Sequence, residues 1–334
     1  MRILLIGGTG NISAECAAWL AGRGDDVTVL TRGRTPAPAG CRLLAADRKD
    51  PAAMRRAVAQ AEPEVVVDFL AYEVDDLRQD CELLRGRVRQ FVFISSATVY
   101  AKPHTQVPLR EDAPRGDNGW DYGRKKLECE LWLEACRRES GFPVTVVRPS
   151  HTYSRIWVPN VVSSASYTVA ARLEQGRPVF IPDDGKTPWT LTAASDFAAG
   201  LGGLLGLPEA VGESFHITSD EVLDWNRIHA EIAAAVGAET PQFVHIPTDF
   251  ICAQAPRLLG SLKADKAQVG VFDNTKIKRF VPGFACRKPF RQGVRESVAW
   301  LRGHPELKNL KPELDAEIET VLAAWAGRAG AGGA

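Results

Sequence analysis

Three side chains have the types and the spacing for proton transfer to or from an alcohol. Tyr122 and Lys126 are one helical turn apart, so on a helix they share a face. An ammonium beside a phenol stabilises the phenolate and lowers its pKa from about 10 toward neutral pH. Ser96, after a predicted strand, can hold the same substrate oxygen. Together they can take a proton from an alcohol while its hydride leaves for a nicotinamide, or reverse that step.

A glycine-rich turn near the start of the chain is typical of a diphosphate site. The first predicted strand covers residues 2–6 and the first predicted helix covers 14–23, with Gly7-Gly8-Thr9-Gly10-Asn11-Ile12-Ser13 between them. Gly7 and Gly10 permit a tight turn, and the N–H groups at the helix start attract a diphosphate. The spacing Gly7-x-x-Gly10-x-x-Ser13 is wider than the G-x-G-x-x-G fingerprint of dinucleotide-binding proteins. The alternative is that the glycines only form the turn between strand and helix and bind no ligand.

The next two predicted strands cover residues 26–30 and 42–46, and the residues that follow each of them indicate which dinucleotide is bound. In this fold type an acidic residue after the second strand accepts a hydrogen bond from the ribose of NAD, but Thr31 and Arg32 stand there, with Arg34 nearby. A guanidinium suits the 2′-phosphate of NADP, so NADP is favoured over NAD; a solvated basic loop is the alternative. Asp47, after the third strand, either accepts a hydrogen bond from adenine or caps a helix.

Strands and helices alternate through about residue 150, which predicts an α/β fold of the Rossmann type: a doubly wound parallel sheet with both faces covered. Ligands bind such sheets beyond the carboxyl ends of the strands. We expect residues 1–155, with about 190–218, to form the dinucleotide-binding domain. Residues 156–189 and 219–325 form a smaller C-terminal α/β substrate-binding part, and 326–334, nearly all alanine and glycine, form a disordered tail.

Composition excludes several classes of function. The 41 basic residues balance 41 acidic ones, so no global charge attracts nucleic acid or an anionic membrane. No apolar run approaches the ~20 residues that span a bilayer. The seven cysteines are scattered and lack C-x-x-C or ligand spacing, which predicts reduced thiols, a cytoplasmic protein and no metal site.

With these residues in place, the chain resembles the extended short-chain dehydrogenase/reductases, which include NAD(P)-dependent sugar-nucleotide epimerases and dehydratases. The resemblance covers Met1 to about Leu301. It rests on the glycine turn, Asp47-Arg48, Ser95-Ser96-Ala97-Thr98-Val99-Tyr100, Tyr122-Gly123-Arg124-Lys125-Lys126 and Val146-Val147-Arg148-Pro149-Ser150-His151-Thr152-Tyr153, with a weaker echo at Asp183-Asp184-Gly185, Ser195-Asp196-Phe197-Ala198 and Asp273-Asn274-Thr275-Lys276.

The resemblance implies roles for individual residues. Tyr122 is the acid/base, Lys126 lowers its pKa and binds the nicotinamide ribose, and Ser96 rather than Ser95 hydrogen-bonds the reacting oxygen. Pro149 and His151 would line the nicotinamide end. Alternatively, His151 is a proton donor to a substrate carbon, or a loop histidine whose hydrogen bonds are satisfied within the protein. The implied cofactor-binding residues are Gly7, Thr9, Gly10, Asn11, Ile12, Arg32, Asp47, Arg48, Leu70, Ala71, Tyr72, Lys126, Pro149 and His151.

Three departures from the family pattern narrow the expected function. Dehydratases place Asp-Glu where this chain has Ala97-Thr98, so dehydration is disfavoured. Arg32 replaces the acid expected for tightly held NAD, which suits a reductase that consumes NADPH. An arginine that clamps a nucleotide diphosphate is commonly found where this chain has Trp189, so Lys186, Arg155, Arg172 or Arg177 would have to substitute. Trp157 and Trp189 either stack on a base or sugar or simply pack.

The first hypothesis is therefore an epimerase of an activated sugar, namely a nucleotide sugar, that acts through a transient ketone and returns the hydride to the other face. The second is an NADPH-dependent ketoreductase of a sugar or secondary metabolite with the same residues. A third, non-catalytic reading is an NADP-binding regulator. The expected partner is a small molecule, and a homodimer is the expected assembly.

Overall fold

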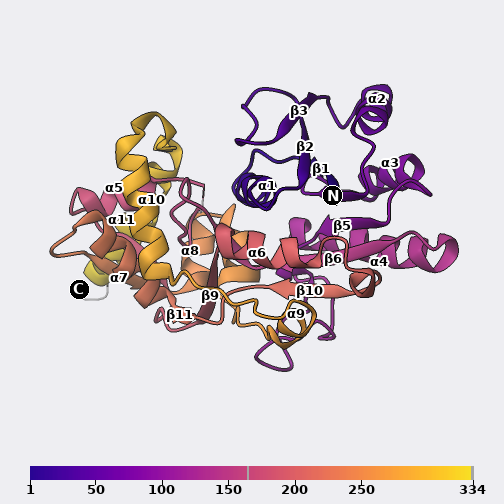
Figure 1. The fold of residues 1–334 in the computed structure, drawn as a ribbon. Coiled ribbons are helices and arrows are strands. Elements are labelled where there is room, and N and C mark those ends of the chain that lie inside the picture. Colours follow the sequence, from indigo (N-terminus) through magenta and orange to yellow (C-terminus); the bar gives the residue numbers. More distant parts are fainter. Residues whose placement is uncertain (164, 332–334) are drawn as a thin grey trace.

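The computed structural model describes residues 1–163 and 165–331 (Figure 1). The first half contains β1 (Arg2–Ile6), α1 (Ser13–Gly22), β2 (Asp26–Thr31), β3 (Arg42–Ala45), α2 (Pro51–Ala61), β4 (Val65–Asp68), α3 (Val74–Leu84), β5 (Gln90–Ile94), the 3₁₀ turn η1 (Ala97–Val99), α4 (Asp121–Ser140), β6 (Val144–Pro149) and β7 (His151–Tyr153). The second half contains α5 (Thr168–Glu174), β8 (Val179–Pro182), β9 (Pro188–Ala193), α6 (Ala194–Leu204), η2 (Pro208–Ala210), β10 (Ser214–Ile217), β11 (Val222–Asp224), α7 (Trp225–Val236), β12 (Phe243–Ile246), α8 (Thr248–Gln254), η3 (Leu259–Lys266), α9 (Thr275–Phe280), α10 (Phe290–Gly303), η4 (Pro305–Leu307) and α11 (Pro312–Ala331).

A seven-stranded parallel sheet is the centre of the fold. Its order is β10-β6-β5-β4-β1-β2-β3, and every neighbouring pair is parallel. The strand order reverses direction at β1 and β4, which is the place where such sheets bind ligands. The predicted Rossmann-type α/β fold is confirmed.

Apolar side chains on both faces of the sheet explain why helices pack on each face. Along β1, Ile3 and Leu5 pack toward α1 and α6, while Leu4 and Ile6 pack toward α2, α3 and α4. All four are buried, as period-two alternation requires of a strand between two helical layers. The layers fix where each strand ends, and therefore where the residues after each strand lie.

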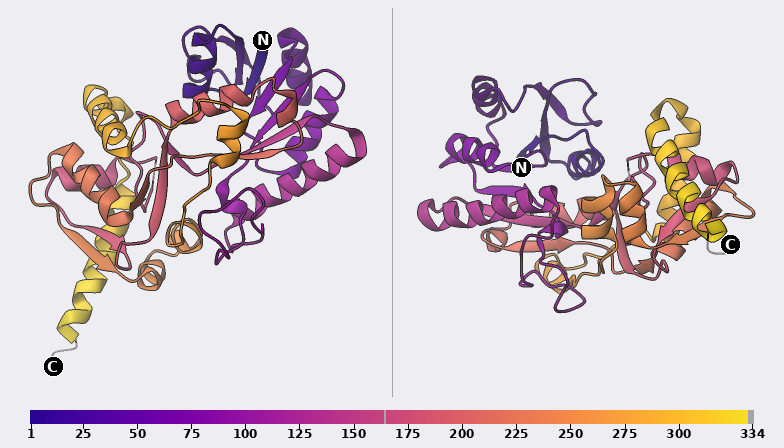
Figure 2. Two further views of the ribbon diagram at one scale, coloured as in Figure 1. Left: turned by 60° about the horizontal axis from the view of Figure 1, so that its bottom comes forward. Right: turned by 180° about the vertical axis from the view of Figure 1, so that it is seen from behind.

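The smaller part, expected from the sequence to bind substrate, is built on two small sheets and the C-terminal helices (Figure 2). One sheet has the order β11-β9-β7 and the other pairs β12 with β8. Between β9 and β11 the chain returns to the large sheet, where α6 packs on α1 and β10 pairs with β6. β7 follows β6 after a single residue, so the two parts meet directly beside the ends of the central strands.

Two features of this part differ from the sequence expectations or add to them. η3 is a π-helix, which no sequence pattern had indicated. α11 continues to Ala331, past the expected boundary of the tail at 326, and residues 332–334 lie outside the described residues. Within residues 1–163 and 165–331, no helix is long and apolar enough to span a membrane, and no three His, Cys, Asp or Glu side chains are grouped to hold a metal.

Candidate active site

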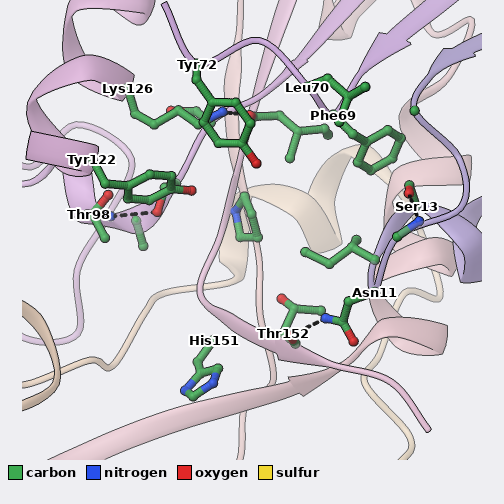
Figure 3. Close-up of a pocket in the computed structure, with 18 of the residues that line it drawn as sticks. Asn11, Ser13, Phe69, Leu70, Tyr72, Thr98, Tyr122, Lys126, His151 and Thr152 are labelled. Carbon is green, nitrogen blue, oxygen red and sulfur yellow. Dashed lines mark hydrogen bonds between the residues drawn. The ribbon is translucent and has the colours of Figure 1, made fainter. Parts of the chain in front are cut away.

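A cavity of about 930 Å³ opens between the carboxyl ends of the central strands and the elements β7, β9 and η3 (Figure 3). All but one of the residues expected to bind the cofactor or carry out the chemistry line it. The exception is Ala71, which is fully buried behind the wall. Tyr72, Tyr122 and Lys126 lie on one side of the opening, and Asn11 and His151 lie across from them (Figure 3).

The glycine turn forms the cavity wall at the start of α1. Gly8 has φ +113°, and a Cβ there would lie 2.5 Å from Cγ1 of Val29. Only glycine therefore lets the turn pack this closely on β2. The Gly10 N–H donates a 2.9 Å hydrogen bond to Oγ of Ser13. The turn presents bare backbone to the cavity, and this cradle fits a dinucleotide diphosphate.

Asn11 binds the opposite wall with its side chain. Its amide nitrogen donates to the Thr152 carbonyl oxygen at 2.8 Å. Its amide oxygen accepts hydrogen bonds from the Ser154 backbone N–H at 2.9 Å and from Ser154 Oγ at 2.8 Å. These two bonds saturate the amide oxygen, whereas the second N–H of the amide nitrogen remains for a ligand in the cavity.

The end of β2 carries two exposed arginines. Arg32 and Arg34 both line the cavity, and neither forms an ion pair with any carboxylate in the described part of the chain. Asp47, at the end of β3, also lines the cavity and accepts a hydrogen bond from the Lys49 N–H. Asp50, not Asp47, caps α2 by accepting hydrogen bonds from two N–H groups. The helix-capping alternative for Asp47 is therefore not what the structure shows.

Arg48 reaches the cavity wall, but carboxylates hold its guanidinium. It pairs with Asp68 at 2.8 Å and Asp80 at 2.9 Å, and lies 3.4 Å from Asp76. The carboxylates raise the Arg48 pKa against the opposing effect of burial. Burial and the neighbouring Asp68 raise the pKa of Asp80 well above its usual value. Arg48 thus supports the end of β4, where Asp68 also accepts the N–H groups of Leu70 and Ala71.

The loop after β4 forms the next section of wall. Leu70 and Tyr72 are exposed to the cavity. Ala71 instead turns its carbonyl oxygen toward Lys126, whose Nζ donates to it at 2.8 Å and to the Ile94 carbonyl oxygen at 2.8 Å. Ala71 therefore positions a lysine instead of lining the cavity itself.

Lys126 lies on α4, buried at the back of the site. Its ammonium sits 4.6 Å from the ring centroid of Tyr72 and 4.8 Å from that of Phe93. Burial lowers the pKa of Lys126 to about 8, although Asp68 partly opposes the shift. Two carbonyl oxygens use two of its three donors, and the third remains for a ligand in the cavity.

Tyr122 lies in the first turn of the same helix, next to Ser96 in the cavity wall. A hydrogen bond with the Ser96 side chain lowers the pKa of the phenol, but burial raises it more, with a smaller contribution from Tyr72. Ser96 Oγ also accepts the Thr98 N–H at 3.2 Å, which caps η1. The Lys126 ammonium, one helical turn away on the same helix, is directed to the two backbone carbonyl oxygens. Tyr122 is therefore a protonated phenol at neutral pH.

His151 begins β7, one residue after the end of β6. Burial and the nearby ammonium of Lys266 lower its pKa well below the usual value, so the imidazole is neutral. Pro149, the last residue of β6, lines the cavity beside it. The structure therefore brings together Tyr122, Ser96 and Lys126 on one side and Pro149 and His151 on the other.

Comparison with known proteins agrees with this geometry. The NAD dependent epimerase/dehydratase family matches residues 3–82 and 81–217. The chain belongs to this family. It is an NAD(P)-dependent epimerase or reductase of the extended short-chain dehydrogenase/reductase type, as the sequence motifs had predicted.

Two relatives and one solved structure illustrate the family range. The chain is 28% identical to 2'-dehydrokanamycin reductase of Streptomyces kanamyceticus over 97% of this chain and 90% of that protein. It is 29% identical to dTDP-4-dehydrorhamnose reductase of Streptomyces griseus over 90% of this chain and 94% of that protein. The UDP-glucose 4-epimerase of Thermus thermophilus, in complex with NAD, has the same fold with a TM-score of 0.70, at 21% identity over 91% of this chain and 99% of that one.

The cavity wall near η3 holds residues that the family motifs had not indicated. Lys102, from the loop before α4, pairs with Asp265 of η3 at 2.8 Å. Lys266, the last residue of η3, lines the cavity and is buried. No local pattern could have found them, because a loop and a π-helix far apart in the sequence bring them to one site.

Three tryptophans belong to the cavity wall, whereas the basic residues considered as replacements for the family arginine lie elsewhere. Trp120, Trp157 and Trp189 line the cavity. None of the four basic residues considered as replacements for the family arginine lines the large cavity: Lys186 is exposed just after a turn, Arg155 stacks on Trp300 beside a smaller cavity, and Arg172 and Arg177 pair with Asp315 and Glu319.

Proposed function

We propose that the protein is an NADPH-dependent reductase that converts the ketone of a nucleotide-linked sugar to an alcohol. The placement of Ser96 and Tyr122 together in the cavity wall carries this proposal. Two hydroxyls there can bind a ketone oxygen, and the phenol of Tyr122 can give it a proton. The relatives named as reductases support the same direction.

Ser96 and Tyr122 are the groups that hold the ketone oxygen. Both line the cavity, and a ketone oxygen that takes the place of their contact with each other can accept from the two hydroxyls. A nicotinamide bound in the cavity would supply the hydride. Tyr122 gives its proton to the oxygen as the alcohol forms, and solvent returns a proton to the phenolate. Ketone, hydride and proton are thereby consumed and one alcohol is produced.

NADP is the proposed form of the cofactor. Arg32 and Arg34 are cations without carboxylate partners in residues 1–163 and 165–331, and both line the cavity at the end of β2. A 2′-phosphate would satisfy them with charge-assisted hydrogen bonds, whereas the hydroxyl of NAD would not. The glycine turn would hold the diphosphate, and the free donor of Lys126 would reach a ribose hydroxyl.

Epimerisation of a nucleotide sugar is the second candidate, favoured by the family match and by the shared fold of UDP-glucose 4-epimerase. The two reactions differ in cofactor balance. A reductase consumes NADPH in step with product, and an epimerase leaves nicotinamide absorbance unchanged while an isomer appears. We would incubate the purified protein with NADPH and a panel of keto sugars and nucleotide sugars, and follow absorbance and product together. Isomer formation without NADPH loss would replace the reductase proposal.

A non-catalytic NADP-binding regulator is the third candidate inherited from the sequence. The bonded pair of Ser96 and Tyr122 at the cavity argues against it, because a binding protein has no need of a proton donor there. Unchanged function in a Tyr122→Phe variant, whatever function is measured, would revive this candidate.

Location and assembly are also proposals. All seven cysteines are free thiols, and even Cys81 and Cys136, with Sγ atoms 3.7 Å apart, form a hydrogen bond and no disulfide. A reducing compartment maintains such thiols, which supports the cytoplasm. We propose a homodimer, the assembly expected from the sequence, and light scattering of the purified protein would measure its mass directly.

A further inference from the structure

The π-helix η3 (Leu259–Lys266) closes the substrate side of the cavity. It belongs to the substrate-binding part, yet it contacts the loop that precedes the catalytic helix α4. π-helical turns are rare and occur frequently at functional sites. The question is which side chain this element places in the cavity.

Two contacts fix η3 against the cofactor domain. The Trp120 indole packs on Gly260 so closely that a Cβ there would overlap the ring. Lys102 bonds with η3 through the Asp265 carboxylate at 2.8 Å and the Ala264 carbonyl oxygen at 2.9 Å. Trp120 also lies 5.0 Å from the Tyr122 ring, measured between centroids. The end of η3 is therefore held in a defined position relative to the catalytic tyrosine.

Lys266 is the residue that this arrangement places in the cavity wall. Its side chain is 9% exposed, and Nζ donates one long hydrogen bond, 3.2 Å, to the Ser261 carbonyl oxygen. No carboxylate in the described part of the chain forms an ion pair with it. An ammonium has three donors, so this group lacks acceptors for most of them.

The charges around Lys266 leave a positive excess. Asp265 attracts the ammonium and Lys102 repels it, but these two already pair with each other. His151, the other titratable side chain that faces Lys266, is neutral. A buried cation without a partner is costly, and here burial lowers the Lys266 pKa. Such a residue is retained at a cost to stability when a ligand supplies the missing charge.

A second unsatisfied donor lies close by. The Trp225 indole N–H donates to the Lys266 carbonyl oxygen at 2.8 Å, and Trp225 packs against Trp189 with ring centroids 5.5 Å apart. Trp189 lines the cavity, and its buried indole N–H has no hydrogen-bond partner among the described residues. A ligand with several acceptor oxygens would satisfy both donors.

We propose that Lys266 is the specificity-determining residue of the cavity and binds an anionic oxygen of the substrate, a phosphate or a carboxylate. The proposal deepens the proposed function and rests on it for the sugar, but the anion is inferred from Lys266 itself. Lys266 would also take the role of the diphosphate-binding arginine that the family has near the position of Trp189, although no sequence motif indicates Lys266.

The test measures anion binding with the NADP complex of the protein, so that the cofactor's own diphosphate site is filled. Thermal unfolding is followed with increasing pyrophosphate, UDP-glucose and UDP-glucuronate, because a ligand that binds the folded state raises Tm with its concentration. The variants are Lys266→Met, Lys266→Arg and, as matched control, Lys263→Met, an exposed lysine of the same helix that pairs with Asp249.

We expect Lys266→Met to fold, to have an unchanged or higher Tm without ligand, and to bind the anions at least about tenfold more weakly, as for loss of a charge-assisted bond. Lys266→Arg should retain part of the affinity, and Lys263→Met all of it. A loss confined to UDP-glucuronate assigns the sugar carboxylate, and a loss shared with UDP-glucose assigns the diphosphate.

The outcomes separate this proposal from the proposed function. Equal anion binding by Lys266→Met and wild type overturns the role of Lys266, as does wild type that binds none of the three anions, even if it reduces neutral ketones with NADPH. Anion binding that depends on Lys266, in a protein that reduces no ketone, supports the role of Lys266 and rejects the reductase.

Discussion

The side chain of Asn11 donates a hydrogen bond to the Thr152 carbonyl oxygen at 2.8 Å, which joins the glycine turn to the second residue of β7. The same amide accepts two hydrogen bonds from Ser154. β7 begins at His151, so the diphosphate end of the cavity and the far wall are fixed to each other through one side chain. Asn11 therefore acts as a positioning residue across the cavity.

Replacing Asn11 with alanine should weaken cofactor binding, because it frees the glycine turn from β7. Three hydrogen bonds are lost, each worth about 0.5–1.5 kcal/mol, so we expect a lower Tm and roughly tenfold weaker NADPH binding. NADPH fluorescence titration and thermal unfolding measure the two effects. Asn309→Ala, which removes an exposed amide bonded to the Ala165 carbonyl oxygen, is the control and should change neither. Unaltered NADPH affinity in Asn11→Ala would show that the turn holds its shape alone.

Replacing Arg32 with alanine should discriminate between the two cofactors. If Arg32 binds the 2′-phosphate, the loss of a charge-assisted hydrogen bond weakens NADPH by about tenfold or more and leaves NADH within about twofold. The measurement is the dissociation constant of each cofactor for wild type, Arg32→Ala and Arg56→Ala, an exposed arginine on α2. Equal losses for NADPH and NADH would refute the 2′-phosphate role.

The fold could be predicted from the sequence because local signals determine it. Strands alternate with helices, and the glycine turn between β1 and α1 is contiguous in the chain. The far partners could not be predicted. Arg48 looked like a cofactor residue, yet tertiary packing surrounds it with Asp68, Asp76 and Asp80 from the β4–α3 region. Lys266 reaches the cavity only because η3 is a π-helix docked on Trp120, and no sequence period encodes that docking.

Replacing Tyr122 with phenylalanine should abolish most turnover while the cofactor still binds. Only the proton-donating hydroxyl is removed, and general acid catalysis contributes about 10²–10⁴-fold, so kcat should fall by at least about 10²-fold. Steady-state kinetics with a reducible ketone measures the fall, and NADPH fluorescence checks binding. Tyr167→Phe, a tyrosine bonded to Glu174 away from the cavity, is the control. Activity within a few-fold of wild type would remove Tyr122 from the chemistry.

The pKa of Lys126 predicts a pH limit for the reductase. Burial lowers this pKa to about 8, and the ammonium form supplies the donor to the cofactor. As pH rises through about 8 the ammonium is lost, so kcat/KM for NADPH, which reports the free enzyme, should fall on the alkaline side. Tyr122 does not add a limb in this range, because its raised pKa keeps it protonated.

Two variants assign that alkaline limb. Lys126→Arg, checked for folding by circular dichroism, keeps its charge above the pH where lysine loses it and should move the limb upward. Lys125→Met, which replaces the exposed neighbour paired with Glu73, should leave the profile unchanged. A limb near pH 8 that persists in Lys126→Arg would belong to another group.

Replacing Arg48 with methionine should strongly destabilise the protein. The guanidinium and its three carboxylates are all buried, and removal of one member leaves uncompensated buried charges, which costs about 3–5 kcal/mol in the free energy of unfolding. Arg78→Met is the control, because Arg78 pairs with Asp75 on the surface and such pairs contribute about 0–1 kcal/mol. Urea unfolding of both variants measures the difference.

The Arg48 variant also links this cluster to the cofactor. Asp68 accepts hydrogen bonds from the N–H groups of Leu70 and Ala71, and the Ala71 carbonyl oxygen accepts from Lys126. If Arg48 acts only by holding Asp68, Arg48→Met should weaken NADPH binding because the loop after β4 is displaced. Asp80→Asn should weaken NADPH binding less, because the Asp80 carboxylate accepts no hydrogen bond from this loop. Normal stability with lost NADPH affinity in Arg48→Met would instead show that the guanidinium binds the cofactor directly.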